Sequence, residues 1–221
     1  MNRVPAQAAI FDMDGTIVDT EPDAQAALRQ VFDRYRVPHD DALLRRFIGR
    51  RGPEVFAELA YLFPGQDPGE LAAEVGAKYR AAGVPPAVVF PGAVELLGEI
   101  HRRGDPLGLV TSGTRRYVRP RLGQLGLLEL FAVIVTADDV TTGKPDPQGY
   151  QRARLELGVP APLCVVFEDA PAGIAAAKAA GLYCVAVAST HPPSQLDHAD
   201  QIVSDLTKIT WPVLVPSAAR S

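Results

Sequence analysis

Two carboxylates set two residues apart near the N-terminus have the types and spacing best suited to chemistry. Asp12 and Asp14 follow an apolar run at 8–11 and precede a Gly15-Thr16 turn. The run is typical of a buried strand, and residues i and i+2 of a strand point to the same face, so we expect both side chains side by side. Close carboxylates repel each other, which raises the pKa of one unless a cation intervenes. The pair therefore predicts a divalent-metal site, an acid and nucleophile pair, or both.

Later in the chain, further polar residues follow apolar, strand-like segments or lie in the loops after them. These residues are Thr111, Ser112, Lys144, Glu168 and Asp169. A parallel sheet gathers the carboxyl ends of its strands along one edge, where ligands bind in open α/β folds. We therefore expect these residues to lie beside the first aspartate pair.

Together the set fits phosphoryl transfer, although each motif alone is a weak signal. A carboxylate nucleophile can accept a phosphoryl group as an acyl phosphate, and a second carboxylate can protonate the leaving oxygen and later activate water. Mg²⁺ prefers hard oxygen ligands and offsets the repulsion between two anions. Hydroxyl and ammonium donors can hold the non-bridging oxygens as charge develops. Agreement of the motifs in order and at strand ends is what favours this interpretation.

The elements that must position these residues alternate between strand and helix from about residue 90 onward. We expect strands at 8–11, 107–110, 131–136, 163–167, 182–188 and 201–203, and helices at 93–103, 117–125, 149–157 and 171–180. This alternation predicts an α/β fold: a Rossmann-like parallel sheet with helices on both faces.

A helical insertion interrupts that alternation after the first strand. The stretch between Asp14 and Thr111 is far longer than one βαβ step of about 30 residues. Its surplus predicts helices at 22–35, 41–47, 53–62 and 69–82. We therefore expect a core of residues 1–18 and 87–221 and a small helical cap of residues 19–86, placed over the carboxyl ends of the strands.

Composition narrows the class of protein and its partners. Charged residues make up 22% of the 221 residues and the formal net charge is −4, so we expect no nucleic-acid partner. No apolar run approaches the roughly 20 residues that span a bilayer, and no secretory signal is visible, so we expect a cytoplasmic protein without a membrane partner. The sequence does not fix the oligomeric state, and it is compatible with a monomer.

Four segments carry a family resemblance that covers the chain from Ala8 to about Asp205. DMDGT at 12–16, TSG at 111–113, GKPDP at 143–147 and FEDAPAGI at 167–174 resemble the four motifs of the haloacid dehalogenase-like hydrolase superfamily. The resemblance is to the branch with a helical cap inserted after the first motif, which includes sugar-phosphate phosphatases and β-phosphoglucomutase. Four motifs in this order are highly specific.

The resemblance implies a role for each matching residue. Asp12 would be the nucleophile that becomes an aspartyl phosphate, and Asp14 the general acid and base, with its backbone carbonyl on the metal. Either Thr111 or Ser112, together with Lys144, would bind the phosphoryl group. The implied Mg²⁺ ligands are Asp12, Asp14, Asp169 and, directly or through water, Glu168.

Within this family we expect a phosphatase acting on a small phosphorylated metabolite, with a sugar phosphate as the preferred class. A mutase of the β-phosphoglucomutase type is the alternative. The mutase branch carries a Lys-Gly-x-Ser-Arg run in the cap and a His twelve residues after the nucleophile, whereas this chain has Ile48–Gly52 as IGRRG and Ala24. Arg50 and Arg51 are the candidate substrate contacts from the cap. A phosphorylated receiver domain is a third class, disfavoured because its acidic pair precedes the phosphorylated Asp and it carries no cap.

Overall fold

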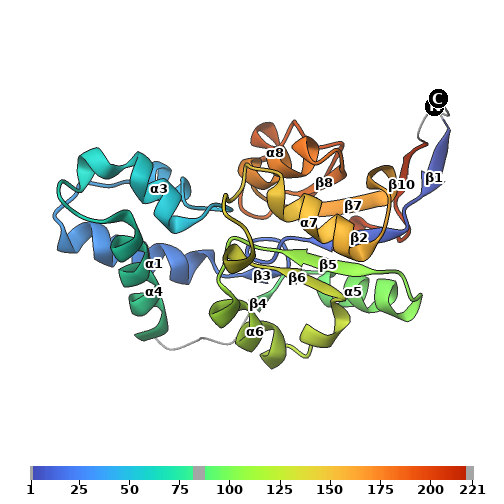
Figure 1. Ribbon diagram of the computed structural model, residues 1–221, viewed down its shortest axis with the longest axis horizontal. Coiled ribbons are helices and arrows are strands. Elements are labelled where there is room, and N and C mark those ends of the chain that lie inside the picture. The colour runs from blue at the N-terminus through green and yellow to red at the C-terminus, as the bar shows by residue number, and fades with distance from the viewer. Residues whose placement is uncertain (1, 82–87, 218–221) are drawn as a thin grey trace.

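A six-stranded sheet forms the centre of the molecule, with β2 and β7 in the middle (Figure 1). The computed structural model describes residues 2–81 and 88–217. The strands, in spatial order, are β6 (Val133–Val135), β5 (Leu107–Val110), β2 (Ala8–Phe11), β7 (Cys164–Glu168), β8 (Tyr183–Val187) and β9 (Gln201–Val203). Every pairing between neighbours is parallel. The predicted α/β class with a parallel sheet is confirmed.

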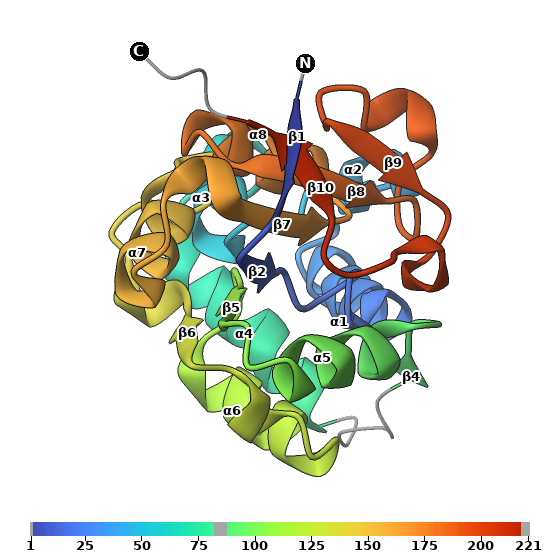
Figure 2. The same cartoon turned by 90° about the vertical axis from the view of Figure 1, so that its right-hand side faces the viewer.

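Helices cover both faces of this sheet, as Figures 1 and 2 show from two directions. They are α5 (Ala93–Arg102) and α6 (Arg115–Gln124) on one face, and α7 (Gln148–Leu157) and α8 (Pro171–Ala179) on the other. Alternate residues of β2 supply the two sides: Ala9 and Phe11 join the apolar cluster under α5 and α6, whereas Ala8 and Ile10 join the cluster under α7 and α8. A strand buried on both faces explains why its sequence is continuously apolar.

Helix α6 differs from the sequence-based expectation at its start, and it holds Pro120 in its interior. It begins two residues before the expected Tyr117, and it runs through Pro120 as one helix. Proline lacks the N–H that would bond four residues back and usually kinks or ends a helix. Val118 and Leu122 are both fully buried on the sheet side, so packing holds the helix together across this defect.

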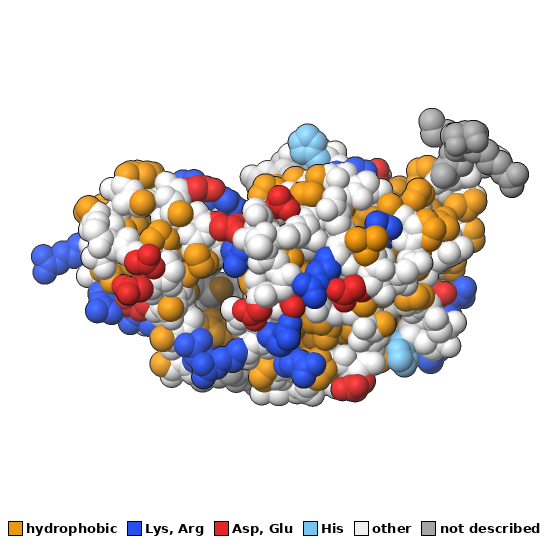
Figure 3. Space-filling model, in the orientation of Figure 1, with side chains coloured by type: hydrophobic (Ala, Val, Ile, Leu, Met, Phe, Trp, Pro, Cys, Tyr) orange, Lys and Arg blue, Asp and Glu red, His pale blue; other side chains and the backbone are white. Residues whose placement is uncertain are grey.

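Four further helices form a separate lobe, at the left of Figure 1. They are α1 (Glu21–Arg34), α2 (Asp41–Arg45), α3 (Gly52–Glu58) and α4 (Pro68–Ala81). The rings of Phe32, Phe56 and Phe63 meet at its centre, with centroids between 5.1 and 6.2 Å apart. Figure 3 shows a hollow in the surface between this lobe and the sheet-containing part, with Lys and Arg side chains gathered below it. The helical insertion is thus a small lobe with an apolar core of its own.

Two short antiparallel pairs were not expected from the sequence. β1 (Arg3–Pro5) pairs with β10 (Leu214–Pro216), and β3 (Val18–Asp19) pairs with β4 (Val88–Val89). Strands of two or three residues are too short to show a periodic pattern. The β3–β4 pair joins the two ends of the helical insertion. The expected domain division stays a prediction, because its second boundary, between 86 and 87, and the last residue of the expected helix 69–82 lie outside the described residues.

Across residues 2–81 and 88–217, no helix combines the length and the apolar character needed to cross a membrane.

Candidate active site

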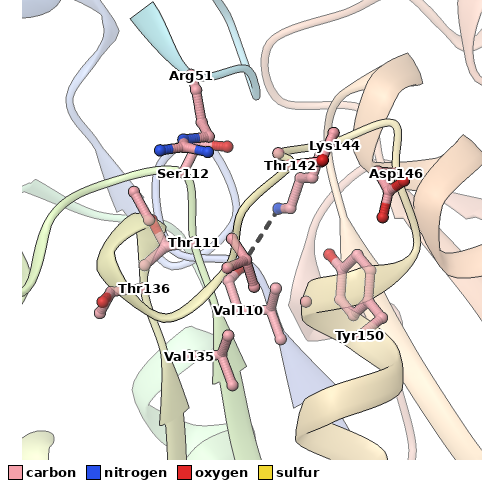
Figure 4. A pocket seen from close by; sticks show the side chains of 14 residues that line it. Arg51, Val110, Thr111, Ser112, Val135, Thr136, Thr142, Lys144, Asp146 and Tyr150 are labelled. Atoms are coloured by element: carbon pink, nitrogen blue, oxygen red, sulfur yellow. Dashed lines mark hydrogen bonds between the residues drawn. The ribbon is translucent and has the colours of Figure 1, made fainter.

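A buried lysine links two carboxylates at the carboxyl edge of the sheet. Lys144, from the loop after β6, donates from Nζ to Asp12 Oδ1 and to Glu168 Oε1, both at 2.5 Å. It also donates to the carbonyl of Val110, at 3.3 Å, the bond drawn in Figure 4. All three charged side chains are at most 5% exposed. The structure therefore brings together residues from three separate sequence motifs.

Asp12, Glu168 and Asp169 form an acidic cluster around one point. Each offers one carboxylate oxygen, and these oxygens lie within 4.8 Å of one another. Among the described residues, the buried Oδ2 of Asp12 has no hydrogen-bond partner. Burial raises the pKa of Asp12 well above its ordinary value, and the neighbouring carboxylates raise it further, while Lys144 opposes them. A bound cation would relieve this repulsion.

Asp169 is held by hydroxyls from two different loops. Thr16 Oγ1 donates to its Oδ1 at 3.0 Å, and Thr190 donates to its Oδ2. Gly15 passes so close that a Cβ there would lie 2.2 Å from Asp169 Oδ2, and its φ is +91°. Only glycine tolerates both the close approach and the positive φ, which explains its place in the first motif. Burial raises the pKa of Asp169 well above the ordinary value.

Glu168 is saturated by donors of the protein. Its Oε1 accepts from Lys144 and from the Tyr150 hydroxyl at 3.0 Å, and its Oε2 accepts from the backbone N–H groups of Asp169 and Ala170, both at 2.9 Å. A carboxylate with this many partners is firmly fixed and holds Lys144 in place. Burial alone would lower the pKa of Lys144, but Asp12 and Glu168 raise it above its ordinary value, so the lysine carries its charge.

The carboxylate of Asp14 is not one of the three in the acidic cluster, although it lies near enough to raise the pKa of Asp12. That the two side chains lie side by side stays a prediction, and the strand rule used for it does not hold here. The strand β2 ends at Phe11, and the chain turns at Gly15, so the alternation rule for strands does not apply. Asp14 Oδ1 accepts from Thr20 Oγ1 at 2.9 Å and from Tyr117 at 2.5 Å. Burial raises the pKa of Asp14, and these two hydrogen bonds lower it.

The two hydroxyl candidates of the second motif have different surroundings. Thr111 is 5% exposed, and its Oγ1 lies 3.5 Å from Asp14 Oδ2. Ser112 instead donates to the carbonyl of Gly49 in the helical lobe, at 3.0 Å. Thr111 therefore faces Asp14, whereas Ser112 bridges the two lobes.

The helical lobe rests on the site through α3 and the turn before it. Arg51 donates to the carbonyl of Thr141 at 3.0 Å, and Glu54 accepts from the backbone N–H of Gly143 at 2.9 Å. Arg51 lines a pocket together with residues from β5, β6 and the Lys144 loop, and Figure 4 shows it directly above Ser112. The loop that carries Lys144 is thus braced from the cap side.

Of the two cap arginines expected to contact substrate, only Arg51 lines this pocket. Arg50 is paired with Glu58 of the same lobe, through two guanidinium nitrogens. The bidentate pair lowers the pKa of Glu58 to about 2. The structure therefore separates the roles of two arginines that are adjacent in sequence.

Several residues of the site were not singled out from the sequence. They are Thr16, Thr20, Tyr117, Tyr150, Ser189 and Thr190. Ser189 and Thr190 follow β8, so the same strand-end rule would have found them if it had been applied to that strand. Tyr117 and Tyr150 lie within helices, and only the packing of those helices shows which way each ring points.

Known proteins are similar to this chain along most of its length. The chain matches the model of the haloacid dehalogenase-like hydrolase family over residues 9–187. It is 45% identical over 211 residues to the validoxylamine A 7'-phosphate phosphatase of Streptomyces hygroscopicus subsp. limoneus, covering 96% of this chain and 99% of that protein. It is 32% identical over 203 residues to hexitol phosphatase A of Escherichia coli (strain K12), covering 91% and 92%.

A solved structure shares the fold along most of the chain. The putative β-phosphoglucomutase of Thermotoga maritima superimposes with a TM-score of 0.67 at 32% identity, covering 89% of this chain and 94% of that one. The matches over nearly the whole length agree with the four motifs and with the parallel sheet that brings these motifs together. This chain is an enzyme that belongs to the haloacid dehalogenase-like hydrolase family.

Proposed function

We propose that this protein is a Mg²⁺-dependent phosphatase that hydrolyses a small phosphorylated sugar through an aspartyl-phosphate intermediate. The observation that carries the proposal is the free, buried Oδ2 of Asp12, held beside Lys144 and two further carboxylates. A buried polar atom without a partner is costly, so it is expected where an incoming group will use it. The phosphatase relatives support the reaction class.

In the proposed first step, Asp12 Oδ2 attacks phosphorus while the bond to the leaving oxygen breaks and Asp14 gives that oxygen its proton. Lys144 and the Thr111 hydroxyl hold the non-bridging oxygens. In the second step, Asp14 takes a proton from water, whose oxygen attacks phosphorus and releases Asp12 and inorganic phosphate. The fixed hydrogen bonds of Lys144 to Asp12 and Glu168 mean that little reorganisation is needed between steps.

The donor set fits a hard divalent cation. Asp12 and Asp169 would hold Mg²⁺ through their carboxylates, with the backbone carbonyl of Asp14 as a further ligand, while Glu168, whose oxygens already accept four hydrogen bonds, would add its negative charge and hold Lys144. Oxygen donors at a buried, negatively charged point are the ligands that Mg²⁺ prefers. When bound, the cation neutralises charge on the transferring phosphoryl group.

The cap residues favour hydrolysis over phosphosugar mutation. A mutase must grip a second phosphate, and the cap offers Arg51 at the pocket, while Arg50 is occupied by Glu58. Ala24 stands where the mutase branch has its His. A mutase stays the alternative, since a solved neighbour is described as a putative β-phosphoglucomutase and Arg51 is a suitable phosphate ligand. The helical lobe over the site argues against a receiver domain.

The test is phosphate release across a panel of sugar phosphates and p-nitrophenyl phosphate, with Mg²⁺ and with EDTA, beside an assay for isomerisation of β-glucose 1-phosphate. We expect repeated turnover that requires Mg²⁺ and is abolished in Asp12→Asn. Asp23→Asn, an exposed change on α1, is the matched control and should retain full activity.

Turnover by Asp12→Asn, or no phosphate release by the wild type with Mg²⁺, would overturn the proposal. Isomerisation faster than release would favour the mutase.

A further inference from the structure

A tyrosine of the core connects Asp14 to the last helix of the cap. Tyr117, on α6, donates to Asp14 Oδ1 at 2.5 Å. The ring of Tyr79, on α4, meets the Tyr117 ring edge to face, with centroids 5.8 Å apart and planes at 81°. Such a contact contributes about 0.5–1.5 kcal/mol beyond its buried area and fixes ring orientation. The orientation of Tyr117 therefore depends on a residue from the other lobe.

A buried cation ties the two phenols together. Arg121 lies four residues after Tyr117 on α6, hence on the same face of the helix, and is 2% exposed. It donates to the Tyr79 hydroxyl, and its positive charge acts on the Tyr117 phenol. A positive charge beside a phenol makes its O–H a better hydrogen-bond donor, here from Tyr117 to Asp14. Cap, arginine, phenol and carboxylate thus form one continuous chain of contacts.

This chain distinguishes the two oxygens of Asp14. Oδ1 accepts from both Thr20 and Tyr117, whereas among the residues that the structure describes Oδ2 has only the long 3.5 Å contact to Thr111. With Oδ1 fixed by two hydroxyls, Oδ2 is the oxygen left to exchange a proton with the reacting groups. Loss of the Tyr117 hydroxyl would leave Thr20 as the single close donor, and the carboxylate would be free to rotate.

We infer that Tyr117 is a positioning residue for Asp14, and that Tyr79 makes this positioning dependent on the seated cap. The inference rests on the proposed function, in which Asp14 protonates the leaving oxygen. In that step the proton passes from Asp14 Oδ2 to the leaving oxygen as the O–P bond to Asp12 forms, and Tyr117 keeps its own proton throughout. The consequence is that full acid catalysis requires the closed arrangement of the two lobes.

Leaving-group dependence tests the inference. In Tyr117→Phe, kcat/KM for a sugar phosphate that the wild type hydrolyses should fall about tenfold or more, as for loss of a hydrogen bond to a charged group. For p-nitrophenyl phosphate, kcat/KM should change less than about twofold, because p-nitrophenolate leaves without a proton. Tyr61→Phe, in the cap and 73% exposed, is the matched control and should change neither value.

An equal fall in kcat/KM for both substrates, or no fall in either, would overturn the positioning role, since general damage to the site does not depend on the leaving group. Failure of the wild type to release phosphate from either substrate would instead overturn the proposed function, and this inference with it.

The contribution of the cap is tested at Tyr79. Tyr79→Leu should lower kcat/KM for the sugar phosphate about threefold or more while sparing p-nitrophenyl phosphate, and Tyr79→Phe should retain more activity because the ring contact remains. If the two tyrosines act along one path, Tyr79→Leu should add little to Tyr117→Phe. Fully additive losses, or equal losses with both substrates, would contradict the link to the cap.

Discussion

The sheet-containing core and the helical lobe bury opposite kinds of side chain. The core buries Asp12, Lys144, Glu168 and Asp169, all at most 4% exposed, at one edge of its sheet. Among the described residues of 21–81, every buried side chain is apolar, and the centre is an aromatic cluster. The cap contributes polar groups at its boundary with the core instead, such as Arg51 and Glu54.

This difference distinguishes the core, which holds the groups suited to the reaction, from the cap, whose buried side chains stabilise the fold. Buried acids with raised pKa values and an oxygen without a partner cost folding free energy, so they are maintained only where other contacts hold them. The centre of the cap, as far as the structure describes it, packs as an ordinary apolar cluster without buried acids. The comparison therefore separates mutations that should destroy the reaction from mutations that should only weaken the fold.

The largest effect is expected at Lys144. Lys144→Met leaves the Asp12 and Glu168 carboxylates buried without their cation, so we expect the free energy of unfolding to fall by about 3–5 kcal/mol in EDTA. Phosphate release should fall at least about 10³-fold. Urea titration and a phosphate assay measure the two effects. Lys178→Met, which breaks a surface pair with Asp200, should cost less than about 1 kcal/mol. If Lys144→Met changed the free energy of unfolding and phosphate release only slightly, the buried charges of the core would not have the importance that this comparison with the cap gives them.

A mutation in the aromatic centre of the cap should lower the stability of the protein and leave the rate of the chemical step nearly unchanged. Phe56→Ala empties the centre of the aromatic cluster and should lower the free energy of unfolding by about 3–5 kcal/mol. At a temperature where the variant is folded, kcat for p-nitrophenyl phosphate should stay within about threefold of the wild type, since no catalytic group is touched. Tyr61→Ala, an exposed aromatic of the same lobe, controls for loss of a ring. A collapse of kcat in folded Phe56→Ala would show that the aromatic cluster of the cap itself acts on the chemical step.

Glu21, at the start of α1, gives the boundary between the lobes a pH dependence. Burial, and to a smaller extent Asp14 and Asp19, raise the pKa of Glu21 from 4.5 to about 7. A raised pKa in the folded state means that the stabilisation is complete below about pH 4.5 and is lost as pH rises through about 7. Glu21→Gln should therefore be more stable than the wild type by about 1–2 kcal/mol at pH 8.

The same difference in stability should vanish near pH 4. Urea titrations at the two pH values measure it, and Glu70→Gln, an exposed glutamate in the first turn of α4, is the control. A difference that does not depend on pH would contradict the raised pKa.

The smallest effect is expected at the contact between the lobes. Arg51→Ala should raise KM for a sugar phosphate about three- to tenfold and change kcat less than about twofold, because Arg51 lines the pocket but touches none of the reacting carboxylates. Arg46→Ala, which loses an exposed pair with Glu58, should leave both constants unchanged. A fall in kcat alone at Arg51 would mean that the residue acts on the chemical step.

Much of the fold was predictable because its signals are local. The strands at 8–11, 107–110 and 201–203 have the expected bounds, and the others differ by one or two residues at each end. A fully buried strand must be apolar throughout, and a helix following it is marked by Gly or Pro at its ends. The pairs β1–β10 and β3–β4 were not predicted because pairing between distant, very short segments has no periodic signature.

The sequence by itself determined which residues could meet, since carboxylates, hydroxyls and a lysine at the ends of parallel strands have one edge to share. Only the tertiary structure decided how they meet. It turned Asp14 away from the acidic cluster toward Tyr117, saturated Glu168, and separated Arg50 from Arg51. The physical reason is that the positions of the strands along the chain follow from local patterns of burial, whereas the direction of each side chain follows from contacts between segments about 100 residues apart along the chain.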